Sequence, residues 1–174
     1  MRQTKKITLS SMMIALGVVF MVLGAVVDVL DLTACAISSL LVVFVYLEIG
    51  SPYTWLVWMC TSLLSFVFFP GKALWIEYLM IFGIYPILKA YIEKLPRKIW
   101  LLIKLLYANV TIILLMLLVK LIFKMPLVDS DIPWMLPAVY VIMNVAFVAY
   151  DLFITVMVRF YFVKLRDRIK HLLK

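Results

Sequence analysis

Five polar side chains recur along one face of the last long apolar stretch of the sequence. At about 100° per residue they fall within an arc of roughly 100° on a helix. A carboxylate held in hydrocarbon needs a cation or a hydrogen-bond donor. The stripe consists of Tyr140, Asn144, Asp151, Thr155 and Arg159.

Lys104, in the preceding apolar stretch, is the candidate partner of Asp151, and Asn109 is expected at a similar depth. Arg159 lies nearer the membrane surface, where its long side chain can reach water. The pattern predicts either a functional network or a structural polar clamp that joins the last two helices. This buried polar network comprises Lys104, Asn109, Asp151, Thr155 and Arg159.

A second polar group, rich in aromatic residues, flanks the apolar stretches on the opposite side of the predicted bundle. Aromatic side chains beside a few convergent polar groups are typical of a small-molecule pocket. Trp and Tyr also form belts at membrane surfaces without any ligand, and that alternative stays open. The predicted substrate-binding residues are Asp28, Asp31, Lys72, Trp75, Glu77, Tyr78, Trp134, Tyr140 and Asn144.

Catalytic motifs are missing from the sequence. It has no zinc-protease motif, no glycine-rich nucleotide-binding motif and a single histidine, His171, near its end. Cys35 and Cys60 lie in apolar stretches without metal-ligand spacing, so both are expected to be small buried residues. We therefore expect no enzymatic activity, no cofactor and no metal.

The amino-acid composition indicates that these side chains lie in a membrane protein. Hydrophobic residues make up 67% of the 174 residues, against about 45–50% in soluble domains. A helix that crosses a bilayer needs roughly 20 apolar residues. The sequence predicts an all-α polytopic membrane protein, a single transmembrane domain over residues 1–174. Its six transmembrane helices are predicted at 7–30, 33–49, 53–69, 73–91, 99–123 and 134–162, with a re-entrant pair as the alternative for the second and third.

The distribution of basic residues predicts the orientation. We expect a multi-pass protein of the plasma membrane. Because cytoplasmic segments retain Lys and Arg, both ends of the chain and the 93–98 loop are expected in the cytoplasm. The charges cluster at membrane flanks and do not indicate nucleic acid as a partner. Only Lys72, Lys120 and Lys124 of the 17 basic residues fall on the outer side in this arrangement.

The last segment, residues 160–174, mixes leucines with five basic residues. Such a cytoplasmic basic amphipathic tail suits an anionic membrane surface or a protein partner. Near the other end, Ser11 and Ala15 lie one helical turn apart, and Ser10, Gly17 and Gly24 repeat every seven residues. Small side chains let another helix approach closely.

Four features of the sequence stand together: six predicted spans, the basic start Lys5-Lys6-Ile7-Thr8, the Ser11–Ala15 pair and the acidic turn at 28–31. In this combination the chain resembles the S components of energy-coupling factor vitamin transporters. In that family an AxxxA motif occupies the place of Ser11 and Ala15 and docks on a transmembrane coupling subunit. Two cytosolic ATPases supply the energy, and a vitamin binds near the outer side. The resemblance implies a substrate-binding subunit for uptake of a small water-soluble vitamin-like molecule.

Two other classes remain as alternatives. A non-catalytic scaffold of bacterial cell-envelope assembly has a comparable size and number of spans. A lipid-modifying membrane enzyme is disfavoured by the missing catalytic motifs.

Overall fold

The computed structural model describes residues 3–123 and 134–166, and nearly all of these residues are helical. Neither range contains a strand. The long helices are α1 (Gln3–Val26), α2 (Asp31–Glu48), α3 (Ser51–Phe68), α6 (Arg97–Phe123) and α7 (Met135–Phe160). Between α3 and α6 lie α4 (Leu74–Glu77), the π-helical turn η2 (Tyr78–Phe82) and α5 (Tyr85–Ile92). A 3-10 turn, η1 (Asp28–Leu30), follows α1, and a π-helical turn, η3 (Tyr161–Leu165), extends α7.

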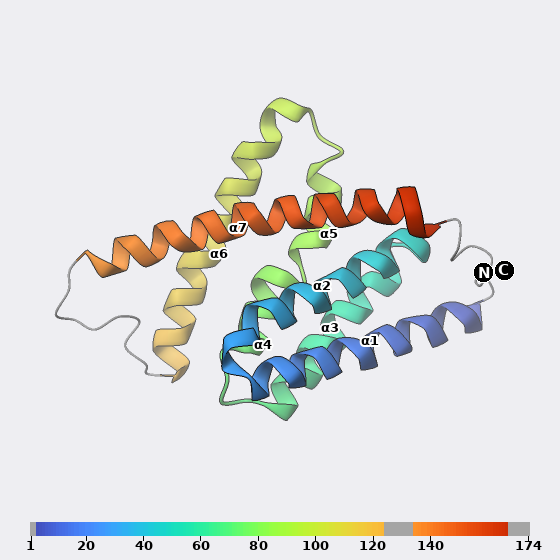
Figure 1. The fold of residues 1–174 in the computed structure, drawn as a ribbon, viewed down its shortest axis with the longest axis horizontal. Coiled ribbons are helices and arrows are strands. Elements are labelled where there is room, and N and C mark those ends of the chain that lie inside the picture. Colours follow the sequence, from blue (N-terminus) through green and yellow to red (C-terminus); the bar gives the residue numbers. More distant parts are fainter. Residues whose placement is uncertain (1–2, 124–133, 167–174) are drawn as a thin grey trace.

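The first three helices pack together as one unit, seen in blue to cyan in Figure 1. Gly24 allows α1 to approach α2, because a Cβ atom placed there would lie 2.6 Å from Ala34 Cβ. Gly50 takes a φ of 106° in the tight turn that joins α2 to α3, a conformation that favours glycine. The core of this unit contains Met21, Cys35, Val42, Val45 and Val57, together with Leu74, Tyr78 and Ile87 from the next elements.

The fourth predicted span is interrupted near its middle. Pro86 has no backbone N–H, so it cannot bond to the carbonyl of Phe82, and the π-helical turn η2 precedes this break. Side chains from three other helices supply the donors. Trp58 Nε1 donates to Leu79 O at 3.2 Å, and Tyr150 OH donates to Phe82 O at 2.9 Å. Tyr107 OH donates in the same way to Met80 O. The break is therefore held by its neighbours.

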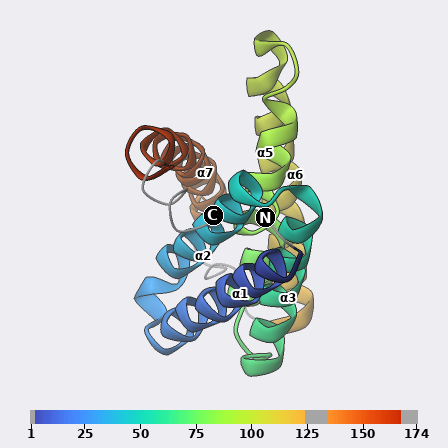
Figure 2. The same ribbon diagram turned by 90° about the vertical axis from the view of Figure 1, so that its right-hand side faces the viewer.

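The last two long helices complete a second core. Figure 2 shows α5 and the start of α6 projecting to one side of the first three helices, and Figure 1 shows α6 crossing α7 steeply. Aromatic packing dominates here: the Tyr85 ring lies 4.6 Å from Phe147 and 5.6 Å from Tyr107 between centroids. The buried members are Tyr85, Ala108, Ile112, Phe147, Tyr150 and Ile154.

Five helical segments are long and apolar enough to cross a membrane, and they contain α1, α2, the α4–α5 segment, α6 and α7. The sequence predicts six, and α3 is the one that does not qualify. It has 18 residues, like α2, but it carries five Ser and Thr residues against three in α2, together with a proline and two tryptophans. Many large apolar side chains are exposed, up to 90% for Val29, which water disfavours and lipid tolerates.

The predicted separators agree with the helix boundaries in the described ranges. The Gly50 turn, the 70–72 turn and the 93–98 loop all lie at or beside breaks between helices. The predicted loop at 125–133 lies outside the described residues. So does most of the predicted basic tail, of which only residues 160–166 are described, as a helical continuation of α7.

Candidate functional site

The most polar site in the described bundle is centred on Asp151 of α7. Lys104 Nζ of α6 lies 3.0 Å from both carboxylate oxygens, so the contact predicted between these residues is present. Tyr85 OH of α5 donates to Oδ1 at 2.6 Å. Lys89 of α5 also donates to Oδ1, and its Nζ lies 2.6 Å from the Asp151 carbonyl oxygen and from Thr155 Oγ1.

Glu93 balances the second positive charge of this cluster. Its Oε1 lies 3.1 Å from Lys104 Nζ and 3.7 Å from Lys89 Nζ. Two ammonium groups therefore face two carboxylates, and Lys89 is only 4% exposed. We call these six residues the Asp151 network: Tyr85, Lys89, Glu93, Lys104, Asp151 and Thr155. It joins α5, α6 and α7 with its charges paired, which is the arrangement that makes buried charge tolerable.

Half of the Asp151 network was not among the predicted site residues. Tyr85, Lys89 and Glu93 are spaced by four, so they share one face of a helix. By its position in the sequence, Lys89 also fits a basic residue at a membrane flank. A lysine inside an apolar stretch, one turn from a tyrosine and from a glutamate, is the signal that could have identified it.

The other predicted network residues lie apart from Asp151. Asn109 accepts a hydrogen bond from Tyr140 OH and donates to Leu105 O at 2.8 Å. Asn144 donates to Tyr140 O at 3.0 Å. The Tyr140–Asn109 hydrogen bond forms a smaller polar contact between α6 and α7, whereas the other two bonds lie within one helix. Arg159 is exposed at the end of α7 and lies outside both groups.

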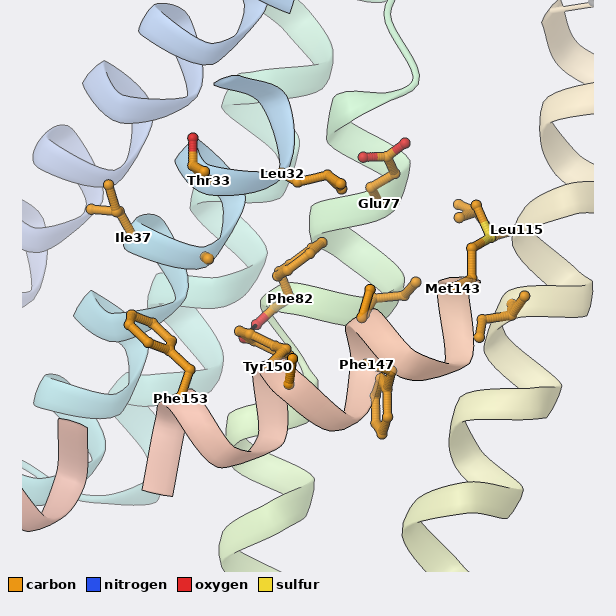
Figure 3. Close-up of a pocket in the computed structure, with 15 residues that line it drawn as sticks. Leu32, Thr33, Ile37, Glu77, Phe82, Leu115, Met143, Phe147, Tyr150 and Phe153 are labelled. Atoms are coloured by element: carbon orange, nitrogen blue, oxygen red, sulfur yellow. Dashed lines mark hydrogen bonds between the residues drawn. The ribbon is translucent and has the colours of Figure 1, made fainter. Parts of the chain in front are cut away.

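A cavity of about 540 Å³ lies between α2, η2, α6 and α7 (Figure 3). This volume falls in the range of small-molecule sites. Its walls are almost entirely apolar, and Thr33, Ile37, Ala146 and Ala149 are exposed, so it opens between α2 and α7. We call it the Glu77 cavity. Its lining residues are Leu32, Thr33, Ala36, Ile37, Glu77, Ile81, Phe82, Ile112, Leu115, Met143, Ala146, Phe147, Ala149, Tyr150 and Phe153.

Glu77 is the one charged residue among those that line this cavity. Its Oε2 atom is buried and has no hydrogen-bond partner. Glu77 ends α4, directly before the π-helical turn, so the interrupted helix positions it. Figure 3 shows Glu77 and Thr33 at one end of the cavity and the aromatic side chains of α7 at the other.

The other predicted substrate-binding residues do not line the cavity. Tyr78 is fully buried in the core of the first three helices, and Trp75 packs on Phe66 with a centroid distance of 4.8 Å. Trp134 is 68% exposed at the start of α7. Asp31 and Lys72 are half-buried and also do not line it. Asp28 lies in η1, and its side chain is not among those described.

The cavity itself was not predicted, because its walls carry no distinctive sequence signal. Phe82, Phe147, Tyr150 and Phe153 come from two distant stretches and look like ordinary apolar residues of membrane helices. Only the three-dimensional gap between α2 and α7 shows that these side chains border a cavity.

The small residues of α1 divide between two faces. Ser10, Gly17 and Gly24 are buried, and Ser38 Oγ of α2 donates to Gly17 O at 3.0 Å. Ser11 and Ala15 are exposed on the other face. The seven-residue repeat therefore packs inside the bundle, whereas the Ser11–Ala15 pair is left on the surface of this chain.

Within residues 3–123 and 134–166 no group of three His, Cys, Asp or Glu side chains could hold a metal ion. Comparisons with family models, curated proteins and solved structures give no match to this chain. The fold and the sites define a class: an all-helical protein with membrane-length apolar helices, a paired charge network and an apolar cavity.

Proposed function

We propose that this protein is the substrate-binding subunit of a membrane transporter for a small molecule. The observation that carries this proposal is the Glu77 cavity beside an interrupted helix. Transporters commonly build their substrate sites from discontinuous helices near the middle of the membrane. The missing catalytic motifs and the membrane-length helices support transport over an enzymatic role.

The proposed arrangement has six spans in a plasma membrane, with both ends of the chain in the cytoplasm. Fourteen of the 17 basic residues then fall on the cytoplasmic side. The count of six includes α3, whose polar residues Thr54, Thr61, Ser62 and Ser65 are buried toward the bundle, leaving an apolar surface for lipid. In this orientation the Glu77 cavity lies in the outer half and the Asp151 network in the inner half.

Cysteine labelling tests the orientation. In Lys94→Cys, placed in the 93–98 loop, a thiol reagent that cannot cross the membrane should react only after the cells are opened. Both native cysteines, Cys35 and Cys60, are replaced by serine in the background strain. Labelling of Lys94→Cys in intact cells would reverse the proposed orientation.

We further propose that the chain docks on a membrane coupling subunit driven by separate cytosolic ATPases. No nucleotide-binding motif occurs in this sequence, so uptake against a gradient needs an external source of energy. The exposed pair Ser11 and Ala15 supports a docking role, because two small residues one turn apart let a partner helix approach closely.

The experiment compares two substitutions on the two faces of α1. Ala15→Trp should abolish copurification of the coupling subunit and ATPases, while the melting temperature of the isolated chain stays unchanged. Gly17→Trp is the matched control, because even a Cβ placed there would lie 3.3 Å from Thr61 Cγ2, so added bulk should lower the melting temperature.

Normal recovery of the partners with Ala15→Trp would refute docking through this face. Stable association with cell-wall enzymes, without ATPases and without a ligand, would instead support the scaffold alternative.

A further inference from the structure

We propose that the Glu77 cavity takes an amphiphilic amine, a molecule with an apolar body and one protonated nitrogen that pairs with Glu77. This inference names the substrate class of the transporter subunit proposed above and rests on that function. It follows from three features of the cavity: an unpartnered carboxylate oxygen, apolar and aromatic walls, and an opening between two helices at membrane depth.

The carboxylate identifies the polar part of the ligand. Glu77 lines the cavity, and its Oε2 atom is buried and accepts no hydrogen bond. An acceptor left in an apolar medium is costly unless a donor reaches it. A ligand N–H can supply that donor, and a positive charge strengthens the hydrogen bond.

The charges around the cavity select a cation over an anion. No basic residue lines it, and Lys89 and Lys104 belong to the separate Asp151 network, where Asp151 and Glu93 engage them. A carboxylate or phosphate in the cavity would meet Glu77 without any neutralising group. An ammonium group would pair with it.

The walls identify the apolar part of the ligand. Phe82, Phe147, Tyr150 and Phe153 contribute aromatic rings, and Met143 adds an adaptable thioether. Aromatic faces also attract cations. The cavity of about 540 Å³ accommodates a ring system with its substituent.

The opening indicates the route of entry. Thr33 and Ile37 on α2 and Ala146 and Ala149 on α7 line the cavity and are exposed. These residues lie within helices that are suited to cross a membrane. A ligand that partitions into lipid can therefore enter sideways between α2 and α7.

Matched probes test this substrate class. The purified full-length chain in lipid nanodiscs is dialysed against naphthylmethylamine, naphthylmethanol or naphthylacetate, and empty nanodiscs correct for partition into lipid. The three probes share one ring system and differ in charge. The amine should bind saturably and at least about tenfold more tightly than the alcohol, a difference that one charge-assisted hydrogen bond supplies. The acetate should bind most weakly.

Variants then assign the preference to Glu77. Glu77→Gln should lower amine affinity to that of the alcohol and leave alcohol affinity unchanged. Glu48→Gln is the matched control, since Glu48 lies at the far end of α2 and contacts Tyr161 instead of the cavity. Ala36→Trp, which fills the cavity from α2, should remove binding of both probes.

Equal affinity for amine and alcohol, or an amine preference that survives Glu77→Gln, would overturn the proposal. A phospholipid that copurifies at one per chain and blocks all three probes would also overturn it, because the cavity would then be a lipid site. Copurification of ATPases distinguishes failure of this inference from failure of the proposed function. If ATPases copurify but the cavity does not prefer the amine, the substrate class is refuted and the transporter function stands. If the cavity prefers the amine but no ATPase copurifies, the transporter function is refuted and the substrate class stands.

Discussion

The Asp151 network and the Glu77 cavity place carboxylates in the same helical bundle under opposite conditions. Asp151 accepts hydrogen bonds from Tyr85 and from two lysines, and Glu93 completes the charge balance. Glu77 has a buried oxygen without a donor and borders an open volume. A carboxylate whose partners are all supplied by the chain holds helices together. One with an oxygen that lacks a donor can accept a hydrogen bond from something outside the chain.

The largest expected effect concerns the paired site. Asp151→Ala leaves Lys89 and Lys104 facing each other with only the half-exposed Glu93 as a counter-ion. Removal of one partner from a buried ion pair typically costs about 3–5 kcal/mol. The free energy of unfolding in mixed micelles should fall by that amount.

A compensating variant sharpens this result. When Asp151, Lys89 and Lys104 are all replaced by leucine, Glu93 is the one charge of the network that remains, and because it is exposed at the end of α5, stability should recover much of the loss. Arg159→Gln, an exposed change on the same helix, serves as the control and should have little effect. If the triple variant has a lower free energy of unfolding than Asp151→Ala, the network stabilises the bundle by more than the neutralisation of its charges.

Part of the Asp151 network could be predicted from the sequence, because charge in a long apolar stretch is conspicuous. Asp151 needed a cation, and Lys104 lay at a suitable position in the neighbouring helix. Lys89 was missed because a basic residue near a loop satisfies the charge rule for membrane flanks equally well. Whether Lys89 lies at the membrane flank or is buried beside Asp151 depends on the direction of the helix axis, and the break at Pro86 alters that direction.

The cavity could not be predicted, for a different physical reason. Helix periodicity identifies apolar faces, but lipid-facing, core and cavity-lining faces are all apolar in a membrane protein. The predicted substrate-binding residues were therefore chosen by polarity and aromatic character. Of these, only Glu77 lines the cavity, whereas Tyr78 is directed into the core one residue later in the helix.

The interrupted helix between the two sites provides the second prediction. A Cβ at Gly83 would lie 2.4 Å from Trp58 Cδ1, so Gly83→Ala must displace the indole that donates to Leu79 O. Overpacking of this kind typically costs about 1–3 kcal/mol, and thermal unfolding measures it. Gly71→Ala is the control, since no atom lies within 4 Å of that position. Equal melting temperatures for both variants would mean that the break tolerates bulk.

A smaller effect is expected where α6 and α7 share the polar contact outside the Asp151 network. Asn109→Leu removes the acceptor of Tyr140 OH. Hydrogen bonds between membrane helices average about 0.6 kcal/mol, so the loss should be near that value. A double-mutant cycle with Tyr140→Phe measures it. A coupling energy as large as the Asp151 effect would contradict the distinction between charged and neutral contacts.

The smallest expected effect on stability belongs to Glu77, and it should have the opposite sign. Glu77→Gln removes a negative charge from an apolar site where one oxygen has no donor, so it also removes a desolvation cost. The free energy of unfolding should stay constant or rise by up to about 1 kcal/mol. Residues kept for binding often reduce stability in this way, because a site prepared for a ligand is incompletely satisfied without it. The measurement is unfolding of Glu77→Gln beside Asp151→Asn in the same micelles, since both changes convert a carboxylate to an amide of nearly equal size. Asp151→Asn should unfold much more easily than the parent chain, whereas Glu77→Gln should not. A comparable loss in both variants would mean that Glu77 is a structural residue and that the two sites do not differ as their contacts indicate.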